Sequence, residues 1–219
     1  MKKRRRKKFK TFFVLFLLFI ALAMFQTYFQ HQKRTSLLDN HDPFIEVKKY
    51  SPLIQAELAK YQLESHTSLL VALMQQESGG KGGDPMQASE SAGLARNSIT
   101  DPKQSIEVGV LHFQRILTYG NERQVDFPTI IQAYNMGSGY IDYVAQHGGK
   151  HSEELAKEFS LLQVQKQPTL YTCGGDKNNF RYPYCYGDFT YSTKVNKNLQ
   201  LLGDSIPVIN NEKTSGEAF

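Results

Sequence analysis

Eight Lys and Arg residues crowd the first ten positions, and an almost wholly apolar run from Phe12 to Phe25 follows them at once. A folded interior cannot hold so many adjacent cations, so this segment is a membrane signal rather than a core helix. Lys and Arg stay on the cytoplasmic side, which predicts a cytoplasmic basic segment over residues 1–10. A helix over residues 11–29 would rise about 28 Å, close to the hydrocarbon thickness of roughly 30 Å. The sequence therefore predicts a single-pass anchor with the remaining chain outside the cytoplasm.

A cleaved signal peptide is the competing interpretation of the same segment, with Ala21 to Ala23 as the small-residue cleavage site. Against it, Met24, Phe25 and Phe29 keep the stretch apolar beyond that site. We favour the uncleaved anchor, which places the body at the cell membrane. Cleavage would make the body a secreted protein, and in both cases it is exported.

The charge of the body argues against nucleic acid as a partner. Residues 1–34 hold ten of the 26 Lys and Arg and no acid, so residues 35–219 carry sixteen bases against 21 acids, a net charge of −5. A body of that sign repels a phosphate backbone.

The pattern along the body predicts a mainly helical, all-α domain. Residues 31–43 are polar and lack periodicity, so residues 30–50 are expected to form a tether. Residues 51–205 are expected to form the folded domain, and residues 206–219 a disordered tail. Ser51 before Pro52, Thr67, and Asp101 before Pro102 are typical helix start signals. The expected helices begin at Ser51 and then cover residues 68–78, 102–119, 128–134, 140–146 and 153–164, the third one ending at Gly120.

Two further segments stand apart from the helices. Residues 81–98 are rich in Gly, Ser, Asp and Asn, and so long a loop inside a compact domain is usually functional. Alternating tyrosines over residues 182–189 suggest a small hairpin.

Cys173 and Cys185 are the only cysteines. Two thiols without a histidine at ligand spacing do not make a structural zinc site, and an exported protein meets an oxidising environment. A disulfide between them is therefore expected, with two free buried thiols as the alternative.

Glu77 is the candidate catalytic acid. Hydrolysis of a glycosidic bond needs a protonated carboxyl near the bridging oxygen, and burial raises the pKa of such a group. Glu77 ends an apolar helix, where the negative end of the helix dipole also disfavours a carboxylate. Gly79 and Gly80 follow it and leave space for a large ligand.

Asp84 is the candidate second carboxylate. It lies in the loop seven residues after Glu77, and the loop can fold back so that the two carboxyls face each other across a cleft. The alternative is a turn residue, because Asp-Pro commonly begins turns.

Four short blocks occur in order along the chain: Glu77-Ser78, Met86-Gln87, Ala133-Tyr134-Asn135-Met136-Gly137 and Tyr191-Ser192-Thr193-Lys194-Val195. They resemble the Glu-Ser, Gly-Leu-Met-Gln, Ala-Tyr-Asn-x-Gly and Tyr-Val-x-Lys-Val blocks of the soluble lytic transglycosylase and goose-type lysozyme superfamily. Residues 76–91 more narrowly resemble the CwlT-like lysozyme domain, the group that contains pneumococcal vaccine antigen A. The resemblance spans about residues 50–200. It implies a lysozyme-like fold and cleavage of peptidoglycan glycan strands.

The resemblance also implies roles for single residues. Glu77 would be the acid and Asp84 the second carboxylate. Tyr134 and Asn135 would lie beside Glu77, the phenol able to hydrogen-bond its carboxyl, and Tyr191 would close the far wall. The remaining residues expected to line the glycan cleft are Ser78, Met86 and Gln87.

One departure from the wider transglycosylase pattern bears on the reaction. Asp84-Pro85 replaces the Gly-Leu before Met86-Gln87, which puts an acid where transglycosylases commonly have none and favours hydrolysis by a muramidase. Intramolecular attack by the muramoyl 6-hydroxyl, as in a lytic transglycosylase, is the alternative. A non-catalytic surface protein that binds glycan is the alternative from another class.

No cofactor or metal is expected. His147 and His151 are four residues apart, but Gly148 and Gly149 break the helix that would align them, and no carboxylate completes a zinc motif. The expected partners are peptidoglycan strands, the membrane and, since the chain carries no peptidase or wall-binding module, other cell-wall enzymes.

Overall fold

The computed structural model describes residues 20–28, residue 30 and residues 42–203. The chain divides into two units, Met1–Ile45 and Glu46–Phe219. In the first unit, residues 20–28 are helical and exposed. The predicted basic segment, most of the anchor and tether, and the predicted tail lie outside the described residues. Over the described ranges, no helix combines the length and the apolarity that crossing a membrane requires.

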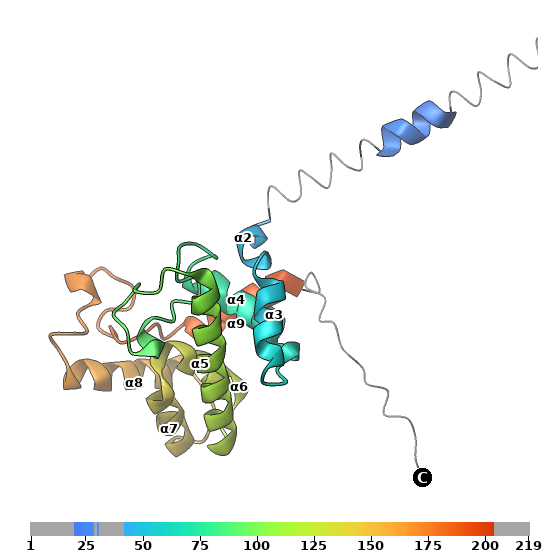
Figure 1. Cartoon of the computed structure of the whole chain (residues 1–219). Helices are drawn as coiled ribbons and strands as arrows, with labels where there is room; N and C mark the ends of the chain where they lie inside the picture. The colour runs from blue at the N-terminus through green and yellow to red at the C-terminus, as the bar shows by residue number, and fades with distance from the viewer. Residues whose placement is uncertain (1–19, 29, 31–41, 204–219) are drawn as a thin grey trace, which may run out of the picture. The chain divides into compact units, whose positions relative to one another are not determined.

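From residue 42 onward the described chain is helical, with no strand (Figure 1). Its α-helices are α2 (Ile45–Lys48), α3 (Ser51–Ala59), α4 (Thr67–Glu77), α5 (Pro102–Glu122), α6 (Phe127–Met136), α7 (Ser138–Gln146), α8 (Glu153–Lys166) and α9 (Tyr191–Leu202). Three short 3-10 turns join them: η1 (Glu64–His66), η2 (Glu90–Ala92) and η3 (Cys173–Gly175).

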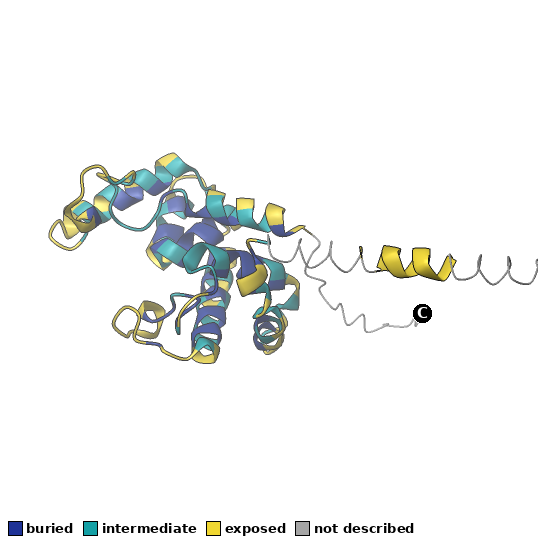
Figure 2. Ribbon diagram, turned by 90° about the horizontal axis from the view of Figure 1, so that it is seen from above, coloured by how far each residue is buried: buried dark blue, intermediate teal, exposed yellow. Residues whose placement is uncertain are grey.

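Helix α4 runs through the core of the second unit. Its residues 69–74 are all buried, as expected for a helix that is apolar on every side. Buried residues gather in the middle of the helical body, and exposed ones lie mostly at its periphery (Figure 2). It packs against α9 on one side and α3 on another, while α6 packs against α5, α7 and α9. The end of this buried helix carries Glu77, so the candidate acid is held by the core itself.

The helix start signals are confirmed at one of the three expected positions. Asp101 caps α5 by accepting a hydrogen bond from the Lys103 N–H, with a proline directly after the cap. The predicted N-caps Ser51 and Thr67 are wrong by one residue. Each is the first residue of its helix, and the N-cap positions are occupied by Tyr50 and His66. The Thr67 hydroxyl instead donates to the Glu64 carbonyl in the turn before α4.

The prediction that Gly120 ends the third helix is also wrong, since α5 continues to Glu122. Gly120 is used for close packing inside the helix. A Cβ atom at this position would lie 2.5 Å from Cγ1 of Ile130 on α6.

Helix α9 is absent from the sequence expectations, although it is a main neighbour of α4. Its buried residues include Tyr191, Val195 and Leu202, which share one face of the helix.

The predicted hairpin over residues 182–189 is not formed, and the segment is a series of turns. The reason lies in Tyr186, whose backbone pairs with a side chain instead of a strand. Its N–H donates to Ser160 Oγ at 3.0 Å, and its carbonyl accepts from the same hydroxyl at 2.8 Å. Its phenol donates to the Met136 carbonyl, which ties the segment to α6.

The predicted disulfide between Cys173 and Cys185 is confirmed. It closes the segment between α8 and α9 on itself and thereby shortens the free loop that leads to Tyr191.

Candidate active site

Glu77 is the last residue of α4, and its side chain is half-buried. Its Oε1 atom accepts a hydrogen bond of 2.5 Å from the Tyr191 hydroxyl. Burial raises the pKa of Glu77 to about 7, against the lowering effect of the Tyr191 hydrogen bond and of the Arg96 charge, and the Asp84 charge raises it further. A carboxyl with this pKa keeps its proton in a large fraction of molecules at neutral pH.

Two buried tyrosines stand beside this carboxyl. The ring of Tyr191 at the start of α9 lies parallel to the ring of Tyr134 on α6, with centroids 6.5 Å apart and an interplanar angle of 4°. The Tyr134 hydroxyl donates to the Met86 carbonyl at 3.3 Å. The phenol that reaches Glu77 is therefore that of Tyr191 and not, as the sequence suggested, that of Tyr134. Burial raises the pKa of both phenols well above the usual range, so both remain donors.

Met86 lies beneath the site and is fully buried. This corrects the expectation that it lines the cleft, because a side chain with no exposed surface cannot touch a glycan. It packs against Gly109 of α5, where an added Cβ would lie 2.8 Å from the Met86 Cβ and 2.9 Å from the Tyr134 hydroxyl. The glycine thus lets α5 approach the two residues closely.

Ser78 and Gln87 make hydrogen bonds within the first part of the loop after α4. The Ser78 hydroxyl donates to the Pro85 carbonyl at 2.7 Å and accepts from the Gly80 N–H. The Gln87 amide donates to the Asp84 carbonyl at 3.0 Å. Gln87 also lines a pocket of about 280 Å³ with Asp84, and the other lining residues are Lys81, Gly82, Gly83, Asn97, Ile99 and Thr100. Both residues keep part of their surface exposed.

Asp84 is 4 % exposed and accepts four hydrogen bonds. Its Oδ1 accepts from the Ala88 N–H at 2.9 Å and the Ser105 hydroxyl at 2.7 Å. Its Oδ2 accepts from the N–H and the hydroxyl of Ser89, at 3.1 and 2.6 Å. Burial raises the pKa of this carboxyl, but the hydrogen bonds outweigh that effect and the net shift is downward. Asp84 is therefore an ionised carboxylate whose lone pairs are all engaged by the loop and by α5.

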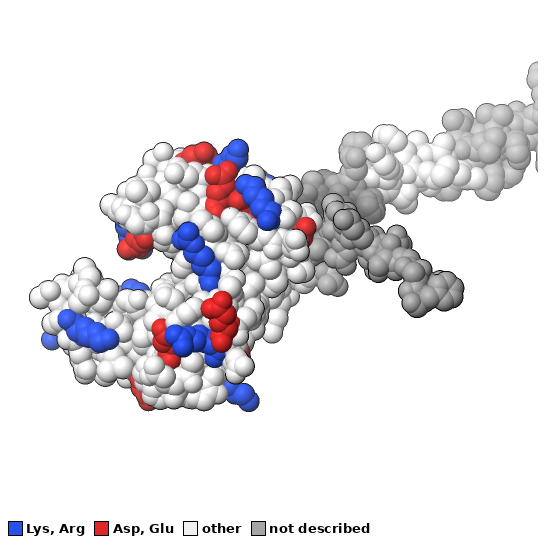
Figure 3. All heavy atoms as spheres, turned by 60° about the horizontal axis from the view of Figure 1, so that its bottom comes forward, with Lys and Arg blue, Asp and Glu red and all other residues white. Residues whose placement is uncertain are grey.

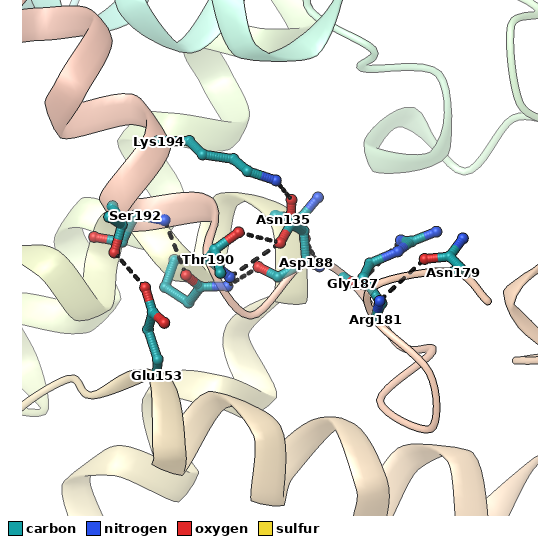
Figure 4. Close-up of polar contacts among 11 residues, drawn as sticks. Asn135, Glu153, Asn179, Arg181, Gly187, Asp188, Thr190, Ser192 and Lys194 are labelled. Atoms are coloured by element: carbon teal, nitrogen blue, oxygen red, sulfur yellow. Dashed lines mark hydrogen bonds and ion pairs between the residues drawn. The ribbon is translucent and has the colours of Figure 1, made fainter. Parts of the chain in front are cut away.

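Asn135 belongs to a polar network that positions the start of α9 (Figure 4). Its side-chain oxygen accepts from the Asp188 N–H at 2.7 Å. The Asp188 carboxylate in turn accepts from the N–H and hydroxyl of Thr190 and from the Lys194 ammonium, the last at 2.6 Å. Gln132 donates to the Asp188 carbonyl and accepts from the Ser192 N–H. These contacts fix the residues directly before and after Tyr191 in the sequence, and they thereby orient its phenol.

Asp188, Gln132 and Lys194 were missed by the sequence reasoning. Asp188 lies three residues before Tyr191, and Lys194 belongs to the block that contains it. Gln132 stands in an otherwise apolar stretch, directly after Ile130-Ile131 and before Ala133. A polar side chain at such a core position indicates a buried hydrogen bond.

The two histidines considered for a metal have other partners. His151 Nδ1 lies 2.7 Å from the Tyr140 hydroxyl, and His147 Nδ1 lies 2.7 Å from the Tyr143 carbonyl. Within the described ranges, no three His, Cys, Asp or Glu side chains are grouped as metal ligands.

The second unit offers an uneven surface of mixed charge. One face is hollowed by a wide notch between two rounded lobes, and both cationic and anionic side chains are scattered over that face (Figure 3).

Comparison with known proteins gives consistent relatives. A model described as lysozyme-like matches residues 45–199. The chain is 46 % identical over 223 residues to the uncharacterized membrane protein YocA of Bacillus subtilis, covering all of this chain and 99 % of YocA. It is 35 % identical over 166 residues to a pneumococcal vaccine antigen A homolog of Streptococcus pyogenes, covering 71 % of this chain and 82 % of that protein.

Two further matches cover parts of longer proteins. The bifunctional muramidase/DL-endopeptidase CwlT of Bacillus subtilis is 43 % identical over 121 residues, which are 55 % of this chain and 36 % of CwlT. The crystal structure of a protein similar to lipoprotein, of the NLP/P60 family, from Staphylococcus aureus superposes with a TM-score of 0.62 at 37 % identity. That match covers 70 % of this chain and 52 % of the other.

Proposed function

The chain belongs to the lysozyme-like family and carries a CwlT-like lysozyme domain, and on this premise we propose that it is a muramidase. It hydrolyses the β-1,4 bond between N-acetylmuramic acid and N-acetylglucosamine in peptidoglycan. The observation that carries the proposal is the half-buried Glu77 carboxyl, held by the Tyr191 hydroxyl, with a pKa of about 7. Such a group retains a proton that it can donate to a bridging oxygen.

We infer that one particular oxygen of Glu77 carries the proton that is transferred. Tyr191 donates to Oε1, so Oε2 is the oxygen that carries the acidic proton. As the glycosidic bond breaks, this proton passes to the leaving 4-oxygen and positive charge develops on the muramoyl ring. Water then adds to C1 of that ring and gives up a proton to the Glu77 carboxylate, which restores the acid. The ionised Asp84 supplies negative charge to the site, and its buried hydrogen bonds hold the loop beside Glu77.

Lytic transglycosylation is a second candidate reaction, and one observation favours it. The four acceptor positions of Asp84 are filled by protein donors, so this carboxylate has no lone pair left to activate water. In that reaction the Glu77 carboxylate would take the proton of the muramoyl 6-hydroxyl, which attacks the same ring.

Mass analysis of the products distinguishes the two reactions. We expect the purified protein to release muropeptides that end in a reducing muramic acid, which are heavier by one water than anhydro products and can be reduced with borohydride. Products that resist borohydride would assign the chain to the transglycosylases. Intact walls after prolonged incubation would favour the non-catalytic alternative.

Tyr191→Phe is expected to move the pH dependence of the reaction. The phenol donates to the ionised carboxylate and lowers the pKa of Glu77, so its removal raises that pKa above about 7. Because Glu77 acts while protonated, the upper limb of the profile of kcat/KM against pH moves to higher pH, by about one unit for a charge-assisted hydrogen bond of roughly 1.5 kcal/mol.

Tyr143→Phe is the matched control for this shift. It removes another phenol that donates to a carboxylate, at 3.0 Å from Glu158, but at an exposed place on α7. The profile of the control should coincide with that of the parent. If Tyr191→Phe also leaves the upper limb in place, the Tyr191 hydroxyl does not set the pKa of the acid.

We also propose that residues 11–29 anchor the enzyme in the cell membrane, with the domain over residues 51–205 outside the cytoplasm. The basic segment, the apolar run after it and the similarity to a protein named as a membrane protein support this proposal. The tether would cover residues 30–50, of which residues 45–48 form helix α2 (Ile45–Lys48). The tail would cover residues 206–219. Peptidoglycan strands, and other enzymes of the cell wall, would be its partners there.

A further inference from the structure

A second pocket lies between α5 and α7, and none of the residues that line it is an expected site residue. Its volume is about 300 Å³, enough for a substituent of several heavy atoms. The lining side chains are those of His112, Arg115, Ile116, Tyr119 and Ser138.

The pocket adjoins the candidate active site through one aromatic ring. The His112 ring meets the edge of Tyr134, with centroids 4.8 Å apart, and His112 Nε2 lies 3.2 Å from the Tyr134 carbonyl. Tyr134 stacks in turn on Tyr191, which bonds Glu77. These ring contacts link the wall of the pocket to the residues that surround Glu77.

The charge of the pocket is positive and unbalanced. Arg115 is exposed, and among the described residues it has no ion pair and no hydrogen bond. The Ser138 hydroxyl is likewise exposed and has no hydrogen-bond partner within the described ranges. The nearby carboxylate of Asp142 is already matched, because it pairs with Arg123 at 3.0 Å and accepts from the Tyr119 hydroxyl at 2.7 Å.

The other walls carry no opposing charge. Burial lowers the pKa of His112, and the Arg115 charge lowers it further against the effect of the Tyr134 carbonyl, so the ring is neutral at pH 7. Ile116 adds an apolar surface beside it. A guanidinium without a partner, a free hydroxyl and an apolar wall suit an anionic group attached to a larger molecule.

We propose that this pocket is a subsite for an anionic oxygen group carried by the glycan strand, with Arg115 binding its oxygens and Ser138 donating a hydrogen bond. The inference rests on the proposed function, because it assumes that a glycan strand passes Glu77. Two sources have this chemistry: a carboxylate of the peptides attached to the strand, and a phosphate of a wall polymer linked to it.

Binding to purified walls tests the subsite without catalysis. Full-length protein in detergent, carrying Glu77→Gln so that the walls stay intact, is compared with the double variant Glu77→Gln/Arg115→Ala by co-sedimentation. We expect the double variant to bind about tenfold more weakly, which corresponds to the loss of one charge-assisted contact of roughly 1.4 kcal/mol. Lys103→Gln in the same background is the control, since it removes an exposed cation from the same helix, and its binding should match the single variant.

Walls stripped in two ways identify the anion. The peptides are removed by an amidase, which frees the glycan strands from the cross-linked wall, so these strands are coupled to beads for sedimentation; the phosphate polymers are removed by hydrofluoric acid. One of the two treatments should abolish the difference in binding between the two proteins, and the other should leave it. Equal binding of both proteins to untreated walls would overturn the subsite, and so would a difference that persists on doubly stripped glycan. If the protein without the Glu77 substitution releases no muropeptides from walls, the proposed function itself fails, whereas normal release with equal binding removes only the subsite.

Discussion

Glu77→Gln lowers the release of muropeptides from purified cell walls by at least about a thousandfold. Loss of the general acid removes several kcal/mol of transition-state stabilisation. Glutamine has nearly the same shape as glutamic acid but cannot donate a proton to the bridging oxygen. The Tyr191 hydroxyl can still donate to the amide oxygen, so the fold around the site is retained. Release is measured as soluble reducing ends per minute at equal enzyme concentration.

The control for this variant is Glu154→Gln, which changes an exposed glutamate on α8. Its rate should equal that of the parent. A Glu77→Gln protein that releases muropeptides at more than about a tenth of the parent rate would show that another group supplies the proton, because a tenfold change corresponds to only about 1.4 kcal/mol.

The same variant is expected to gain stability at high pH. The pKa of Glu77 is raised from 4.5 to about 7 in the folded chain, so between these values the unfolded chain binds fewer protons and stability falls as the pH rises. The full cost of ionising the half-buried carboxyl is up to about 3 kcal/mol above pH 7. Glutamine does not ionise, so Glu77→Gln should be more stable than the parent at pH 8 and equal to it at pH 4.

Urea unfolding of both proteins at these two pH values measures the effect. Differences between the two proteins cancel the contributions of all other titrating groups. A difference that is the same at pH 4 and pH 8 would mean that the pKa of Glu77 is not raised in the folded chain, and the proposed acid would then be largely ionised at neutral pH.

Asp84→Asn is expected to reduce both stability and activity. An asparagine keeps one acceptor oxygen, but its amide group would face donors that now bind Asp84, either those of Ser89 or those of Ala88 and Ser105. Leaving buried donors without acceptors and losing charge-assisted hydrogen bonds costs about 2–4 kcal/mol of folding free energy. The loop between α4 and α5 is then no longer held beside Glu77, so the rate of wall lysis should fall about a hundredfold or more.

The pH dependence of this loss has a defined sign. The pKa of Asp84 is lowered by its hydrogen bonds, so the carboxylate contributes stability above its ordinary pKa of about 4 and that contribution is lost as the pH falls through the lower, folded value. The difference in unfolding free energy between parent and variant should therefore have its largest value at pH 7 and become smaller below about pH 4.

Asp101→Asn provides the comparison for Asp84→Asn. Asp101 caps α5 with a single exposed hydrogen bond, and asparagine is an equally good cap residue. This control should unfold at the urea concentration of the parent. An Asp84→Asn protein that matches the control in stability but loses lysis would indicate that the carboxylate acts on substrate, and one that keeps both would reduce Asp84 to a turn residue.

Local patterns account for much of what the sequence predicted correctly. The cap and proline at Asp101 and Pro102 specify the start of α5, because both act through backbone groups within three residues. The continuous apolar run of α4 makes it a buried helix, and the last residue of this helix, Glu77, is therefore held at the edge of the core. The pairing of the two cysteines followed from their number and from the expectation that the body is exported.

Local patterns failed where a residue satisfied a tertiary demand instead. A glycine often ends a helix, but Gly120 lies inside α5. Helix α6 packs so closely against this position that a larger residue does not fit there. The tyrosines over residues 182–189 alternate as in a strand, yet Ser160 takes both backbone hydrogen bonds of Tyr186. In each case the deciding partner is distant in the chain, so its presence cannot be inferred from neighbouring residues.

The sequence by itself determined that this chain has a helical body behind a basic, apolar N-terminus, and that Glu77 ends a buried helix, because helix formation and burial depend on residue types at short spacing. Only the tertiary structure decided which groups surround the Glu77 carboxyl. Tyr191 reaches it across 114 residues because α9 packs along α4, and Asp84 turns its lone pairs toward Ser89 and Ser105 because the loop folds onto α5. The pKa of an acid depends on those neighbours in space, and their positions follow from how the helices pack rather than from where they lie in the sequence.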